Sequence, residues 1–114
     1  MYYIAKTIEV SACHRLTLDH ESKCARTHGH NWRITLYCKA KALDANGMVC
    51  DFTEIKRKIM GVLDHADLNA ALSFNPTAEN IARWCTEQIP TCYKAVIRES
   101  EGNVAMYVTD EEDR

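Results

Sequence analysis

Residues 24–36 read Cys-Ala-Arg-Thr-His-Gly-His-Asn-Trp-Arg-Ile-Thr-Leu, and this stretch decides how the rest of the chain is arranged. Its second half alternates apolar with polar residues, which predicts an extended strand over about 30–42. In an extended chain, side chains two residues apart leave the same face, so His28 and His30 point the same way. Gly29 between them adds no side chain. The sequence therefore directs two imidazoles at one point.

A second extended segment precedes this stretch, because residues 2–12 carry apolar side chains on one parity and polar side chains on the other. His14 closes this strand. If the two strands pair as a hairpin with a long polar connection, His14 can meet His28 and His30. Three histidines make a zinc site with an open position for water or substrate, which is the catalytic pattern. Alternatively, each histidine is an ordinary surface or core residue with its own hydrogen bond.

Two helices are expected beyond the second strand. An Asn-Gly pair at 46–47 predicts a turn. Apolar residues at helical spacing then follow Asp51 and Thr53, either of which can act as N-cap. A second helix is predicted to begin with Thr77 as N-cap and to end at Pro90.

Two final strands, at about 92–99 and 103–109, complete the predicted fold. The order strand, strand, helix, helix, strand, strand predicts one α+β domain over residues 1–114, with a four-stranded antiparallel sheet carrying two helices on one face. An open sheet of this size leaves two edges, which favours closure by oligomerisation. The acidic tail at 110–114 is expected to fray.

Composition argues against several classes of partner. The 14 basic and 16 acidic residues give a net charge of only −2, so nothing global indicates a nucleic acid or an anionic membrane. The chain opens with no basic and apolar leader, and no apolar run is long enough to span a bilayer. We therefore expect a cytoplasmic protein.

The six cysteines are expected to be free thiols, because the sequence carries no secretory signal. Cys24 differs from the others, since it lies in a polar segment between Lys23 and Arg26, where positive charge favours a thiolate. The other five have apolar or strand-like neighbours and are expected in the core: Cys13, Cys38, Cys50, Cys85 and Cys92.

Three further residues have both a functional and an ordinary interpretation. Asp64 and His65 follow the first helix, either as a solvated helix end or as a dyad in which Asp64 orients a proton-transferring His65. With Cys24 the dyad becomes a triad. Glu99 lies on the same parity as inward-facing residues of its strand, so it is either buried with a partner or exposed at the strand end.

Taken together, these pieces resemble the 6-pyruvoyl-tetrahydropterin synthase family, and more closely its short bacterial branch of 6-carboxy-5,6,7,8-tetrahydropterin synthases. The resemblance runs almost end to end, in five ordered blocks and one further residue. These are residues 11–16, 24–31, 47–52, 63–69 and 76–82, and Glu99.

The resemblance implies a role for nine residues. Zinc ligands are implied at His14, His28 and His30. Catalytic residues are implied at Cys24, Asp64 and His65. Contacts to the pterin are implied at Glu99, which would bind its guanidine-like edge, and at Thr77 and Glu79.

The resemblance also implies an architecture and a reaction. The fold would be a tunnelling fold (T-fold), whose ββααββ subunits form a ring, here a homohexamer built as a dimer of trimers with active sites at subunit interfaces. The reaction would convert 7,8-dihydroneopterin triphosphate to 6-carboxytetrahydropterin, acetaldehyde and triphosphate in queuosine biosynthesis, with Zn²⁺ as the cofactor. The triphosphate is expected to meet basic loop residues, although these also fit ordinary solvated charges: Arg15, Lys23 and Arg26.

Three alternatives stay open at this point. The first keeps the substrate side chain and yields 6-pyruvoyl-tetrahydropterin. The second cleaves the substrate side chain to give a hydroxymethyl pterin. It resembles family members in which a glutamate replaces or supplements the cysteine, and Glu21 lies near Cys24. The third, from another class, is a non-catalytic module that binds zinc or a pterin.

Overall fold

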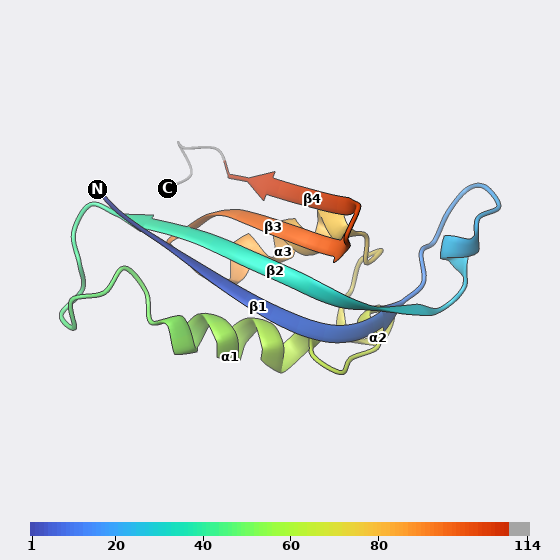
Figure 1. The fold of residues 1–114 in the computed structure, drawn as a ribbon, viewed down its shortest axis with the longest axis horizontal. Helices are drawn as coiled ribbons and strands as arrows, with labels where there is room; N and C mark the ends of the chain where they lie inside the picture. Colours follow the sequence, from blue (N-terminus) through green and yellow to red (C-terminus); the bar gives the residue numbers. More distant parts are fainter. Residues whose placement is uncertain (110–114) are drawn as a thin grey trace.

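The computed structural model describes residues 1–109, in which four antiparallel strands form one sheet in the order β1-β2-β3-β4 (Figure 1). The expected fraying of 110–114 lies outside the described residues. The strands are β1 (Tyr2–His14), β2 (His28–Ala40), β3 (Cys92–Ser100) and β4 (Asn103–Val108). The helices are the 3-10 turn η1 (Lys23–Ala25), α1 (Phe52–Leu63), α2 (Leu68–Ala71) and α3 (Ala78–Gln88). The predicted strand and helix order is confirmed, with η1 and α2 as unpredicted additions.

The β1–β2 pairing continues to the end of the sheet that carries the histidines. His14 ends β1, as predicted, and β2 begins at His28, two residues before the predicted start at about residue 30, so that His14 lies opposite His28. The reason is a contact from outside the hairpin. The segment after α1 runs along the free edge of β1, where the His65 amide donates to the Ser11 carbonyl and the Cys13 amide to the Ala66 carbonyl.

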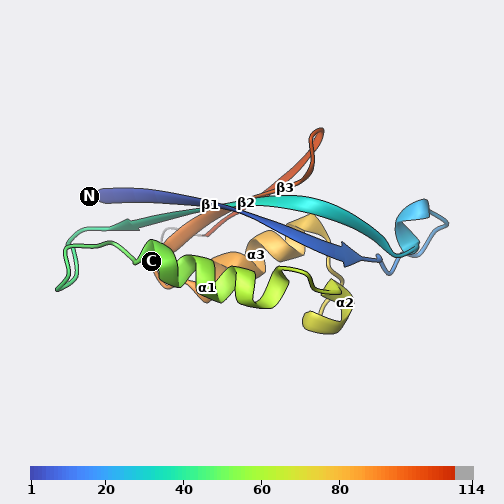
Figure 2. The same ribbon diagram turned by 60° about the horizontal axis from the view of Figure 1, so that its bottom comes forward.

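Both long helices cover the same face of the sheet (Figure 2). Alternation sends one parity of each strand toward these helices, and the buried side chains include Ile34, Leu36, Ile55, Ile59 and Ile97. The predicted helix starts are confirmed by their caps. The Asp51 carboxylate accepts from the Thr53 amide, and the Thr77 hydroxyl accepts from the Asn80 amide at 3.1 Å.

None of the six cysteines, all of which lie within residues 1–109, forms a disulfide, as predicted. Cys38, Cys85 and Cys92 are buried in the core, and burial raises the pKa of the Cys85 thiol. Cys50, in the loop before α1, is partly buried and packs against the core. The prediction was wrong for Cys13, which is only partly buried because it lies on the strand parity that faces away from the helices.

None of the helices within residues 1–109 is long and apolar enough to cross a membrane.

Candidate metal centre

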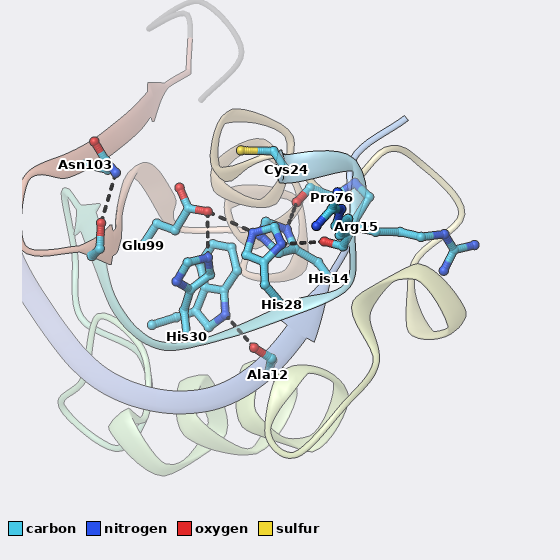
Figure 3. Close-up of polar contacts among 12 residues, drawn as sticks. Ala12, His14, Arg15, Cys24, His28, His30, Pro76, Glu99 and Asn103 are labelled. Carbon is cyan, nitrogen blue, oxygen red and sulfur yellow. Dashed lines mark hydrogen bonds and ion pairs between the residues drawn. The ribbon is translucent and has the colours of Figure 1, made fainter. Parts of the chain in front are cut away.

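Four side chains converge at one end of the sheet: His14, His28, His30 and Glu99. One potential ligand atom from each lies within 4.8 Å of the others. The Oε1 atom of Glu99 lies 3.2 Å from Nε2 of His14 and 3.0 Å from Nε2 of His30. Figure 3 shows the three imidazole rings directed toward this carboxylate.

The strand register explains why these side chains meet. His14 is the direct partner of His28 across the β1–β2 ladder, and His30 is the partner of Ala12 one pair farther along the same face. Glu99 shares the parity of the inward-facing Ile97 on β3, the next strand in the sheet. Its side chain is only 22% exposed, so the inward alternative for this glutamate is the observed one.

Hydrogen bonds to main-chain carbonyls fix the tautomer of two histidines. Nδ1 of His14 donates to the Pro76 carbonyl at 2.8 Å, and Nδ1 of His28 donates to the Arg26 carbonyl at 2.6 Å. A carbonyl oxygen only accepts, so the proton of each neutral ring lies on Nδ1. The lone pair is left on Nε2, which is the arrangement of histidines that bind metals.

The Nε2 atoms of His14 and His30 are buried and make no hydrogen bond within residues 1–109. Oε1 of Glu99 is close enough for an ion pair with each. Burial lowers the pKa of His30 below its usual 6.5, the nearby His14 and His28 lower it further, and Glu99 opposes the shift. His30 is therefore neutral at pH 7, with a lone pair available to a ligand.

This donor set fits zinc. Buried polar atoms without a partner are rare in proteins, and here two of them point into the same space. Neutral imidazole nitrogens and a carboxylate oxygen are ligands that Zn²⁺ accepts in tetrahedral sites. Three histidines alone leave the fourth position of such a site open for water or substrate, whereas Glu99 as a fourth ligand would fill it.

Asp64 and His65 adjoin each other at the end of α1, as the sequence requires, and within residues 1–109 no hydrogen bond or ion pair joins them to the three imidazoles. Oδ1 of Asp64 accepts from the Ser11 amide at 3.0 Å, and Oδ2 lies 3.6 Å from Nε2 of His65. The His65 side chain is 83% exposed, and its φ of 56° is unusual for a residue with a side chain. It lines a pocket whose other residues include Ser11, Cys13 and His30.

Cys24 lies in η1, on the connection that leads into His28 (Figure 3). Its amide donates to the Ser22 hydroxyl at 3.1 Å, and its carbonyl accepts from the Leu16 amide at 2.8 Å. Within residues 1–109, no hydrogen bond or ion pair joins Cys24 to His65. The structure therefore gathers the predicted zinc ligands but leaves the predicted triad divided within one chain.

The remaining predicted site residues lie around this centre with different roles. Glu79 lines a pocket together with Glu99 and the β3–β4 turn. Thr77 uses its hydroxyl to cap α3. Lys23 and Arg26 line a pocket on the 15–27 connection, whereas the Arg15 guanidinium extends away from the imidazoles in Figure 3.

Sequence reasoning missed the groups that hold the histidines in place. The carbonyls of Pro76 and Arg26 are main-chain atoms, so no residue type marks their role. It also missed how close Glu99 comes to the imidazoles. Its shared parity with Ile97 was the available signal.

Comparisons with known proteins agree with this arrangement. The model of the family described as 6-pyruvoyl tetrahydropterin synthase matches residues 3–110. The 6-carboxy-5,6,7,8-tetrahydropterin synthase of Bacillus subtilis is 24% identical over 123 residues, which cover 93% of this chain and 84% of that protein. The protein of the same name from Synechocystis is 38% identical over 93 residues, 74% of this chain and 71% of its own length.

The fold agrees as well. The solved structure of 6-pyruvoyl tetrahydropterin synthase from Caenorhabditis elegans superposes with a TM-score of 0.77 at 24% identity, and the match covers 96% of each chain. This confirms the predicted α+β fold with its four-stranded antiparallel sheet. The family match spans nearly all of the sequence, and so the chain belongs to the 6-pyruvoyl tetrahydropterin synthase family.

Proposed function

We propose that this chain is a zinc-dependent 6-carboxy-5,6,7,8-tetrahydropterin synthase. It would convert 7,8-dihydroneopterin triphosphate to 6-carboxytetrahydropterin, acetaldehyde and triphosphate, in queuosine biosynthesis. The observation that carries the proposal is the group of three imidazoles and one carboxylate whose free atoms converge. The 38% identity to the Synechocystis protein of that name supports the choice of reaction.

The three histidines would hold the metal through Nε2, because their lone pairs are available there. Main-chain carbonyls hold the rings of His14 and His28 by their Nδ1 atoms, so little rearrangement is needed on binding. Zinc at this position would supply Lewis acidity toward the side-chain hydroxyls of the substrate.

Glu99 would orient the pterin. A carboxylate can accept two parallel hydrogen bonds from the planar, guanidine-like edge of the ring. Glu79 lines a pocket together with Glu99, so it would bring a second carboxylate near the edge of the ring. Thr77 lies two residues before Glu79, at the start of α3. Anchoring the ring at Glu99 would bring the substrate side chain toward the imidazoles.

Proton transfer is assigned to Cys24, Asp64 and His65. The Cys24 thiolate would remove a proton, and Asp64 would orient His65 as a second proton carrier. Because no hydrogen bond or ion pair within residues 1–109 joins His65 to Cys24, we infer that a second copy of the chain supplies the His65 that works with a given Cys24. Active sites at the interfaces of a homohexamer would meet this requirement.

The direct test is to incubate the zinc-loaded protein with 7,8-dihydroneopterin triphosphate and identify the products by mass spectrometry. We expect 6-carboxytetrahydropterin together with acetaldehyde. Formation of 6-pyruvoyl-tetrahydropterin or of a hydroxymethyl pterin would contradict the proposed reaction within the family. Absence of turnover with zinc bound would instead indicate a binding module.

Replacing His28 with alanine should remove most of the bound zinc, because only two imidazoles would remain to hold it. Metal content per chain, measured by inductively coupled plasma mass spectrometry after dialysis, checks this expectation. His20→Ala is the matched control. His20 is exposed, and within residues 1–109 its side chain forms a hydrogen bond or ion pair only with its neighbour Asp19. Full zinc retention by His28→Ala would show that the metal binds elsewhere.

Mixing two inactive variants tests the shared site. Cys24→Ala and His65→Ala should each lower kcat by about 10²- to 10⁴-fold while keeping their zinc. If each site takes the two residues from different copies, refolding an equal mixture should restore about one quarter of wild-type activity through intact sites. A mixture no more active than its parents would place both residues of a site on one chain.

A further inference from the structure

The segment that follows His14 is held along one edge by two asparagine side chains. The carboxamide of Asn69 faces the main chain of Arg15, where its Oδ1 accepts from the amide at 2.8 Å and its Nδ2 donates to the carbonyl at 2.9 Å. Asn75 does the same for Thr17, at 2.9 Å and 3.0 Å. We call these two residues the asparagine clamp.

Each carboxamide stands in for the peptide group of a neighbouring strand. In an extended segment the amides of alternate residues point to the same edge, so Arg15 and Thr17 face the clamp and Leu16 faces away. The Leu16 amide uses that opposite edge to donate to the carbonyl of Cys24 at 2.8 Å. The clamp and Cys24 are therefore connected through a single residue.

The two asparagines are themselves well anchored. The amide of Asn69 donates to the carboxylate of Asp67, the N-cap of α2. The carbonyl of Asn75 accepts from the Thr77 amide at 2.8 Å and from the side chain of Asn80 at 3.0 Å. Both asparagines thus belong to the helical layer and can transmit its position to the loop.

Without the clamp, little would fix the position of Cys24 along the chain. It lies within a polar connection of residues 15–27, in which η1 is a single short turn. A long surface connection samples many conformations, and ordering it costs conformational entropy. Two carboxamides that accept and donate simultaneously remove much of this freedom at the start of the loop.

We propose that Asn69 and Asn75 are positioning residues that hold Cys24 in place for proton transfer. The inference rests on the proposed catalytic role of Cys24. Neither asparagine carboxamide bonds to the imidazoles or Glu99 in the described residues, so their effect should fall on the thiol and leave the metal centre intact. Asn69 gives the cleaner test, because Asn75 directly precedes Pro76, whose carbonyl bonds His14.

The test replaces Asn69 with alanine, with Asn75→Ala as the second variant should the first fail to fold. We expect kcat to fall by about 10- to 100-fold, because a displacement of about 1 Å is enough to do so. KM should change by no more than about threefold, since binding contacts persist. Zinc content should equal that of the wild type, and the Leu16 amide should exchange faster with deuterium.

Asn46→Ala is the matched control, because it makes the same substitution in the turn after β2, and it should keep wild-type kcat. Faster exchange at Leu16 with unchanged kcat would overturn the positioning role and leave the clamp purely structural. Unchanged deuterium exchange at the Leu16 amide would show that the clamp does not hold the segment after His14. A loss of zinc in parallel with the fall in kcat would show that the substitution acts through His14. Full turnover by Cys24→Ala would contradict the proposed function itself, which separates the two failures.

Discussion

The arrangement of this protein depends on two main-chain carbonyls that accept hydrogen bonds from the Nδ1 atoms of histidines. The carbonyls of Pro76 and Arg26 hold the rings of His14 and His28 in one tautomer. That choice leaves each Nε2 lone pair facing the same space as His30 and Glu99. In a site without these bonds, the neutral rings would exchange tautomers and rotate, and a metal would have to order them on binding.

At this end of the molecule, segments of the helical layer form hydrogen bonds both with β1 and with the chain that follows it. The segment after α1 adds hydrogen bonds to the free edge of β1, which extends the β1–β2 pairing to His14 and His28. The loop before α3 then supplies the Pro76 carbonyl, and the asparagine clamp holds the chain beyond His14. The chain between the end of α1 and the start of α3 therefore holds both the strands that carry the histidines and the loop that carries Cys24.

Much of the fold and of the metal centre could be predicted from sequence, because both follow from short-range patterns. Alternation placed His28 and His30 on one face, and cap residues located the helix starts. Features that depend on distant contacts could not be predicted. The segment near residue 66 that hydrogen-bonds along β1 lies far from β1 in the sequence, α2 is too short for a helical period, and the clamp joins residues 54 and 58 positions apart.

X-ray absorption at the zinc edge of the metal-loaded protein tests the central claim most directly, because it reports the ligand atoms themselves. Three imidazole ligands predict zinc–nitrogen distances of about 2.0–2.1 Å, with oxygen filling the remaining coordination. A zinc–sulfur distance of about 2.3 Å would contradict the account, because it would make a cysteine such as Cys13 or Cys24 a ligand. Cys24 would then be unavailable as the thiolate that transfers protons.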